Sequence, residues 1–278
     1  MTGYGGRLTG ILAARGRLCV GIDPHPEIIR AWDLPAGPSG LERCARGAVE
    51  ALGDLVAVFK PQSAFFEAYG AAGIAVLERT LADIRDAGAL SLLDVKRGDV
   101  GSTMAAYAAA YLTDGSPLAA DAVTLSPYLG FGSLDGAIEV AVRHGRGVYV
   151  LALTSNPEAV PAQRAQTADG RTVGQLIVDE AAARNAGDQH VGPVGIVVGA
   201  TVGATGTDFS RLNGSILAPG LGAQGATAGD LRTVFGTALP SVLPAMSREI
   251  LTAGPAPADL RAAAGRALGA MHAVIDLG

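Results

Sequence analysis

Short apolar runs recur along the chain, and each is rich in residues that favour β-strands. The runs cover residues 17–23, 55–61, 90–97, 122–128, 147–155, 194–201, 215–222 and 242–249. Within each run hydrophobic residues follow one another without alternating with polar ones, which is typical of strands covered on both faces in a parallel sheet. The pattern therefore predicts eight buried parallel strands.

Amphipathic segments separate these runs. Residues 73–88 and 172–187 carry apolar side chains at three- and four-residue spacing and end at glycine, which predicts crossover helices. Eight strand–helix units in 278 residues favour an α/β fold, a (β/α)8 TIM barrel that forms a single domain over residues 1–278. The competing architecture is a doubly wound open sheet, but no glycine-rich dinucleotide motif follows the first run.

Charged residues collect at the end of the third run, in the stretch "LLDVKRGDVGST" (92–103). Strand side chains alternate between faces, so Asp94 and Lys96 point together into the barrel mouth and Arg97 points away. Lys60 ends the preceding strand and can converge with them. Asp99 lies just beyond the strand, where it can join this group or that of a neighbouring subunit. Active sites of such barrels lie at this end, so the group is a candidate site.

Composition sharpens this interpretation, because Lys60 and Lys96 are the only lysines among 21 basic residues. Arginine stays protonated, whereas lysine can deliver a proton. Carboxylates flanked by ammonium groups can stabilise a developing anion and place one proton donor, which suits carbanion chemistry without a cofactor or metal. The alternative is an ion-pair cluster that only satisfies itself.

Charge and cysteine usage narrow the class of protein. A net charge of −5 without a basic cluster disfavours a nucleic-acid partner. No uninterrupted apolar stretch reaches about 18 residues, so neither a membrane segment nor export is expected. Cys19 and Cys44 suggest neither a disulfide framework nor a metal site, which fits the cytoplasm. The four histidines show no ligand spacing, so no metal is expected.

A glycine-rich stretch, "LAPGLGAQGAT" (217–227), follows the seventh run and contains Gly220, Gly222 and Gly225. Loops after the seventh and eighth strands of such barrels commonly bind phosphate, and Arg248 at the end of the eighth run can add a bidentate contact. The sequence thus predicts a phosphorylated small-molecule substrate. Residues 155–172 are longer than a usual connection and form a candidate active-site loop.

Several stretches together resemble orotidine 5'-phosphate decarboxylase, and specifically its longer bacterial group, type 2. They are "DVKRGDVGST", "FKPQSAFFEAYG", "TLSPYLG", "LTSNP" and "APGLGAQGA", within a match that runs from "GIDPHP" to "MSREIL". The Asp-x-Lys-x-x-Asp pattern alone is shared with sugar-phosphate decarboxylases of the same barrel superfamily. The flanking stretches carry the specificity.

The resemblance implies a role for each matching residue. Lys60, Asp94, Lys96 and Asp99 correspond to a charged tetrad in which Lys96 is the proton donor, and Asp99 and Thr103 are expected to reach the active site of the other subunit in a homodimer with shared sites. The remaining matches are expected to bind substrate: Asp23 at the ribose, Ser155 at the pyrimidine edge, Gln224 between base and phosphate, and Arg248 at the phosphate.

The implied reaction is the last step of de novo pyrimidine biosynthesis, in which orotidine 5'-phosphate loses CO2 and Lys96 protonates the C6 carbanion to give uridine 5'-phosphate. A keto-sugar phosphate decarboxylase would need a metal-ligand set, and a Schiff-base aldolase would need its lysine in an apolar pocket. A non-catalytic protein that binds a phosphorylated ligand is the alternative from another class.

Overall fold

The computed structural model of the chain describes residues 3–189, 191–222, 225 and 227–275. Across these residues eight parallel strands pair in chain order and close when β1 pairs with β8, with Cys19 opposite Ala245. This closure confirms the (β/α)8 barrel and excludes the open sheet. The strands are β1 (Cys19–Ile22), β2 (Val58–Pro61), β3 (Leu90–Arg97), β4 (Ala122–Leu125), β5 (Gly147–Leu153), β6 (Val194–Val198), β7 (Ile216–Pro219) and β8 (Val242–Met246).

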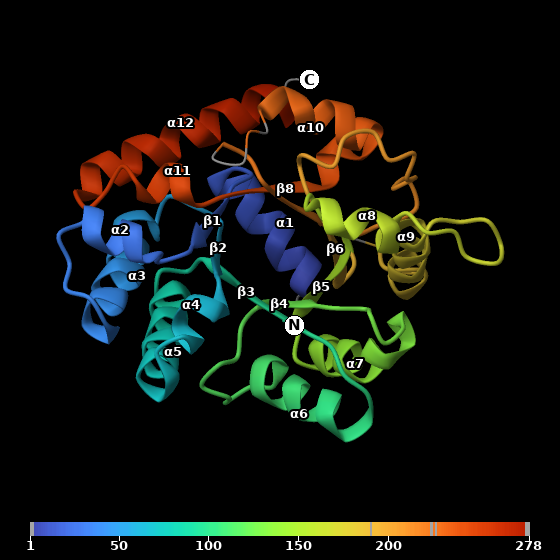
Figure 1. Cartoon of the computed structure of the whole chain (residues 1–278), viewed down its shortest axis with the longest axis horizontal. Helices are drawn as coiled ribbons and strands as arrows, with labels where there is room; N and C mark the ends of the chain where they lie inside the picture. The colour runs from blue at the N-terminus through green and yellow to red at the C-terminus, as the bar shows by residue number, and fades with distance from the viewer. Residues whose placement is uncertain (1–2, 190, 223–224, 226, 276–278) are drawn as a thin grey trace.

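Helices surround the barrel (Figure 1). They are α1 (Tyr4–Arg15), α2 (Pro26–Ala31), α3 (Pro38–Leu52), α4 (Ser63–Glu67), α5 (Gly70–Asp86), α6 (Gly101–Leu112), α7 (Asp135–Arg143), α8 (Val160–Gln163), α9 (Val173–Arg184), α10 (Ala228–Phe235), α11 (Arg248–Leu251) and α12 (Pro257–Ile275), with 3-10 turns η1 (Phe131–Leu134), η2 (Pro157–Ala159) and η3 (Gly236–Ser241). The predicted crossover helices 73–88 and 172–187 correspond to α5 and α9. The connection 199–215 between β6 and β7, described throughout, contains no helix, so the predicted strand–helix unit is wrong at the sixth strand.

Strand side chains divide into an inner and an outer layer, as alternation requires. Leu90 and Leu92 of β3 belong to the apolar cluster inside the barrel, whereas Leu93 and Val95 belong to the layer beneath the helices. Asp94 continues the inner face beyond Leu92. An apolar barrel interior therefore ends in charged side chains at the carboxyl ends of the strands.

Helix α1 covers the opposite end of the barrel. In Figure 1 it lies at the centre of the ring of helices. Its Tyr4 hydroxyl is 3.1 Å from that of Tyr149, and both side chains are buried. Gly147 makes room for the Tyr4 ring, because a Cβ at that position would lie 2.4 Å from it. Since α1 and the barrel interior fill this end, the carboxyl ends of the strands are the open side.

Candidate active site

A cavity of about 290 Å³ opens at the carboxyl ends of the strands. All eight strands contribute to its lining, through residues within them or just after them. The predicted site residues among its lining are Asp23, Lys60, Asp94, Lys96, Gly220 and Arg248. The structure therefore brings together, in one cavity, the charged strand end and part of the predicted phosphate site.

The Asp94 carboxylate is the centre of this cavity's polar network, and it accepts four hydrogen bonds. Oδ2 accepts from Lys60 Nζ at 3.1 Å and from Gln62 Nε2 at 2.9 Å. Oδ1 accepts from Lys96 Nζ at 2.6 Å and from Thr124 Oγ1 at 2.8 Å. A carboxylate offers about four lone-pair positions, so Asp94 is saturated and fixed in orientation.

The charges of Asp94 and Lys60 are stabilised together, although both residues are only 7% exposed. Burial alone would raise the pKa of Asp94, but the Lys60 and Lys96 ammonium groups and the hydrogen bonds outweigh it and hold that pKa below its ordinary value. Burial alone would lower the pKa of Lys60, yet Asp94 and Asp23 raise it above its ordinary value. The pair is ionised across the physiological pH range.

Lys96 occupies an unusual backbone position. Its φ angle is +45°, in the left-handed region that L-residues with a side chain rarely adopt. The pairing of β3 with β4 shifts register between Leu93 and Arg97 at this point. The Lys96 side chain is 46% exposed, whereas that of Lys60 is 8% exposed. Lys96 thus presents its ammonium group to the cavity from a strand irregularity, while Lys60 supports Asp94 from beneath.

Asp23 follows β1 and faces the same cavity. Its Oδ1 lies 4.0 Å from Lys60 Nζ, is buried and has no hydrogen-bond partner in the described structure. Gly21 leaves room for the neighbouring side chains, because a Cβ there would lie 2.6 Å from that of Ser247 and 3.2 Å from Asp23 Oδ2. An unsatisfied buried carboxylate oxygen is ready to accept a hydrogen bond from a ligand hydroxyl.

The predicted phosphate site is described in part. Gly220 and Arg248 line the cavity, and the exposed Arg248 side chain makes no ion pair among the described residues. Gly222 has a φ of +73°, a conformation that favours glycine, and a Cβ there would require the Glu249 carboxylate to move. Gly225 is exposed with φ of +89°. Gln224, predicted to bridge base and phosphate, lies outside the described residues.

Three further predicted residues, Asp99, Thr103 and Ser155, are like Gly222 and Gly225 absent from the cavity lining. Asp99 accepts a hydrogen bond from the Val100 N–H at 2.8 Å, and Thr103 is exposed in the first turn of α6. Ser155 is exposed and lines a separate small pocket, whereas its neighbour Thr154 lines the cavity. The single chain therefore does not bring these three residues to the charged cluster.

Arg97 points away from the cavity, as alternation predicts. Its guanidinium is 2.6 Å from Glu67 Oε1 and lies over the rings of Tyr107 and Tyr111, at 5.6 and 5.9 Å from their centroids. These contacts join β3 to α4 and α6. Arg97 holds helices against the barrel.

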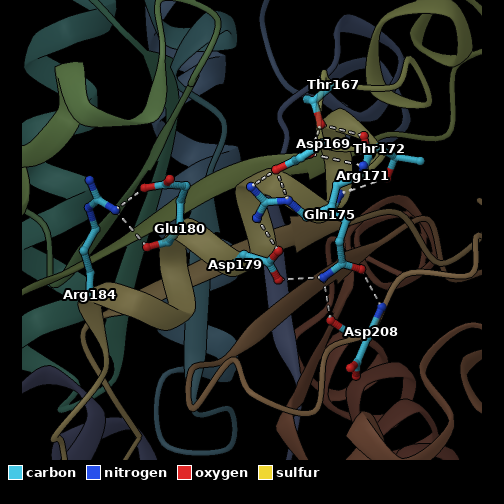
Figure 2. Close-up of polar contacts among 9 residues, drawn as sticks. All are labelled: Thr167, Asp169, Arg171, Thr172, Gln175, Asp179, Glu180, Arg184 and Asp208. Carbon is cyan, nitrogen blue, oxygen red and sulfur yellow. Dashed lines mark hydrogen bonds and ion pairs between the residues drawn. The ribbon is translucent and has the colours of Figure 1, made fainter.

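The candidate loop 155–172 contains short ordered elements, η2 and α8, and is fastened at both ends. At its start, Gln163 accepts from the Thr154 N–H at 2.7 Å and donates to the Thr154 hydroxyl at 2.9 Å. Figure 2 shows the other end, where Arg171 pairs with Asp169 and Asp179, each at 2.6 Å. The loop is thus tied to the cavity rim through Thr154 and to α9 through Arg171.

Sequence reasoning missed Gln62, Thr124 and Thr154, which also line the cavity. Gln62 lies two residues beyond Lys60, so alternation from Lys60 points to it. Thr124 is the one hydroxyl in the run Ala122–Leu125, and a polar side chain within a buried strand is a detectable signal. Thr154 and Ser155 are adjacent polar residues at a strand end, where alternation alone does not tell which one faces inward.

Other expectations concern metals, thiols and membranes. Among the described residues, no group of three His, Cys, Asp or Glu side chains is arranged to hold a metal ion. Both cysteines are buried and unbridged, and burial raises the pKa of each thiol to about 12. Of the helices in the described ranges, none combines the length and apolar character needed to cross a membrane.

Comparison with known proteins gives one consistent result. The model of the family described as "Orotidine 5'-phosphate decarboxylase / HUMPS family" matches residues 16–263. A Salinispora arenicola protein named orotidine 5'-phosphate decarboxylase is 60% identical over 275 residues, which cover 99% of both chains. A protein of the same name from Streptomyces coelicolor is 52% identical over 266 residues, 96% of each chain.

Solved structures agree in fold. A chain from Streptomyces avermitilis superposes with a TM-score of 0.96 at 52% identity, over 99% of this chain and 97% of that one. The OMP decarboxylase of Leishmania donovani superposes with a TM-score of 0.78 at 29% identity, over 98% of this chain and 99% of that one. Both likenesses span the whole barrel, including the strand ends that carry the cavity.

Proposed function

The chain belongs to the orotidine 5'-phosphate decarboxylase / HUMPS family, and from this membership we propose that it converts orotidine 5'-phosphate to uridine 5'-phosphate and CO2, the last step of de novo pyrimidine biosynthesis. The observation that carries the proposal is the Asp94 carboxylate held between the Lys60 and Lys96 ammonium groups in the cavity. Of the activities that this barrel superfamily supports, the one named for its 60% identical relative fits this cluster.

The proposed chemistry begins with charge repulsion. The substrate carboxylate enters beside the ionised Asp94, and loss of neutral CO2 moves that negative charge from the carboxyl group to C6, which relieves the repulsion between the two carboxylates. The C6–carboxyl bond breaks and its electron pair stays on C6. Lys96 Nζ then transfers a proton to C6, which forms the C6–H bond of uridine 5'-phosphate, and water reprotonates the lysine. Lys60 keeps Asp94 ionised and oriented throughout.

Substrate binding is assigned to polar groups at the rim of the cavity. The free Oδ1 of Asp23 suits a ribose hydroxyl. Arg248 and the backbone after Gly220 suit the phosphate, whose binding energy can align the reacting groups with the cluster. We assign the pyrimidine edge to the end of β5, at Thr154 and Ser155, and place Gln224 between base and phosphate.

We further propose a homodimer in which Asp99 and Thr103 complete the site of the partner subunit. Its support is that neither residue lines the cavity of its own chain and that large apolar side chains nearby are exposed, Val100 at 55%, Leu129 at 50% and Tyr128 at 91%. Apolar groups exposed together at neighbouring strand ends are typical of an interaction surface. Two unbridged buried cysteines agree with the cytoplasmic location that we infer.

Turnover tests the proposal directly. Purified protein should convert orotidine 5'-phosphate to uridine 5'-phosphate, followed by ultraviolet absorbance and by release of labelled CO2, and EDTA should leave the rate unchanged because lysines supply the positive charge. Lys96→Ala should abolish turnover. Arg43→Ala, which removes one exposed positive charge on α3, should retain it.

Two results would contradict the assignment. One is the absence of turnover in the unsubstituted, folded protein, which would favour a non-catalytic binding protein. The other is a covalent adduct on Lys96 after borohydride treatment with substrate, which would indicate a Schiff-base enzyme.

A further inference from the structure

The single hydroxyl of Thr124 contacts both the Asp94 carboxylate and the backbone of Lys96. It lies in β4, is 1% exposed and faces the cavity beside Asp94. Its Oγ1 donates to Asp94 Oδ1 at 2.8 Å and accepts from the backbone N–H of Lys96 at 2.9 Å. We propose that Thr124 is a positioning residue that fixes the Lys96 ammonium group for proton transfer. This inference rests on the proposed function.

The irregular pairing of β3 with β4 explains why the Thr124 hydroxyl bonds the Lys96 backbone. Leu93 pairs with Val123 and Arg97 pairs with Leu125, so three residues of β3 oppose Thr124 alone. The Lys96 N–H lies at this irregularity. This partly buried backbone N–H needs an acceptor, and Thr124 Oγ1 provides it. A side chain of the same shape without oxygen, such as valine, would leave that N–H unpaired.

The direction of the Lys96 side chain depends on this arrangement. Lys96 has a φ of +45°, an unfavourable conformation that persists only where surrounding contacts hold it. The Thr124 bond holds the backbone at that residue, and the 2.6 Å contact of Lys96 Nζ with Asp94 holds the other end of the side chain. Thr124 also fixes the Asp94 oxygen to which Nζ is bonded. Loss of the Thr124 hydroxyl therefore loosens Lys96 both at its backbone and at its ammonium group.

A buried threonine elsewhere provides a matched comparison. Thr80 in α5 is 0% exposed, and its hydroxyl donates to the carbonyl of Val76 one turn earlier, at 2.8 Å. That bond closes within one helix and touches no residue of the cavity. Thr80→Val therefore makes the same chemical change as Thr124→Val in a purely structural setting.

The experiment compares steady-state kinetics of Thr124→Val, Thr124→Ser and Thr80→Val with those of the parent protein. Thr124→Val should lower kcat about 10- to 100-fold, the loss typical of a hydrogen bond to a charged group, while KM stays within about threefold because substrate contacts remain. Thr124→Ser keeps the hydroxyl and should stay within about threefold of the parent kcat. Thr80→Val should keep the parent kcat, although its thermal midpoint falls.

Two outcomes would overturn the inference: a Thr124→Val protein with the parent kcat, or a Thr124→Ser protein as slow as Thr124→Val. If Thr124→Val does not fold, the pair Thr124→Ser and Thr124→Ala decides instead, since both lose the methyl group and only one keeps the hydroxyl; equal kcat values would refute the idea. Lys96→Ala distinguishes a failure of this inference from a failure of the proposed function. If it is inactive while Thr124→Val is fully active, this inference fails and the proposed function stands.

Discussion

The buried Lys60–Asp94 pair allows a test that separates a catalytic cluster from a structural one. Asp94→Ala removes the only hydrogen-bond acceptor that the described structure gives the Lys60 ammonium group. Asp23 Oδ1, 4.0 Å away, is then the nearest carboxylate oxygen paired with it. Lys60 is 7% exposed, so its charge stays inside the protein without a hydrogen-bonded partner.

The expected loss follows from that burial. Removing one partner of a buried pair costs about 3–5 kcal/mol of unfolding free energy, whereas replacing both partners by apolar groups is often nearly neutral. With an unfolding entropy of about 2.1 cal/mol/K per residue, a chain of this size should lose about 5–9 °C in its thermal midpoint on Asp94→Ala. The double variant Lys60→Met/Asp94→Ala should recover about 2 kcal/mol or more of that loss.

Turnover should stay low in the double variant even though its stability partly recovers. All three proteins, Lys60→Met, Asp94→Ala and the double variant, should turn over at least about 100-fold more slowly, because each lacks part of the charged array. Urea unfolding and initial rates, measured on the four proteins at one concentration, give the comparison. Asp54→Ala, which breaks an exposed ion pair with Arg261, is the control and should change neither quantity appreciably. A double variant no more stable than Asp94→Ala, or one that regains turnover, would refute the reasoning.

The same proteins give the pH dependence of stability. The Lys60 and Lys96 charges outweigh burial and hold the pKa of Asp94 below its ordinary value, so the unfolded chain takes up this proton first as the pH falls. The contribution of Asp94 is complete above the unfolded carboxyl pKa of about 4 and is lost below it. The parent should therefore lose stability more steeply below about pH 4 than the double variant. If the parent and the double variant lost equal stability as the pH falls below about 4, the assigned lowering of the Asp94 pKa would be wrong.

Further predictions concern the phosphate, the subunits and the thiols. Arg248→Ala should raise KM for orotidine 5'-phosphate at least about tenfold while leaving the weak binding of the unphosphorylated nucleoside unchanged; equal losses, measured by calorimetry, would speak against a phosphate contact. Mixing inactive Lys96→Ala and Asp99→Ala proteins should restore part of the activity if sites are shared, and no recovery after confirmed subunit exchange would refute sharing. Because burial raises the thiol pKa of Cys19 and Cys44 to about 12, neither should react with a disulfide reagent at pH 8 before the protein unfolds.

The barrel could be predicted from the sequence because its main signals are local. Strand β3 has the predicted limits, 90–97, since its apolar run ends in charges. The run at 215–222 was predicted too long, because the strand ends at Pro219 and the positive φ of Gly220 turns the chain out of the sheet. Helix α1 was missed, since its packing depends on Tyr149 and Gly147, more than 140 residues away. No local pattern carries that information.

The site was predictable to the extent that charge and spacing mark it. Lys60, Asp94 and Lys96 stood out by their type and position, and the structure places them within hydrogen-bonding distance. Thr124 and Gln62 were missed because a neutral side chain at a strand end has many possible roles. Their importance lies in the atoms they touch, which depends on the register between strands.

The end of β3 distributes its charges in separate directions, and the irregularity at Lys96 makes this possible. In a regular strand, successive residues face opposite sides and the side chain at position 96 would simply stand above that of Asp94. The left-handed turn at Lys96 instead folds the strand end, so that Lys96 Nζ meets Asp94 in the cavity while Arg97 packs against Glu67 and α6. Asp99 then leaves the barrel beside the exposed Val100. Four charges within six residues thereby serve the cavity, the helix packing and the proposed subunit contact without competing for the same partners.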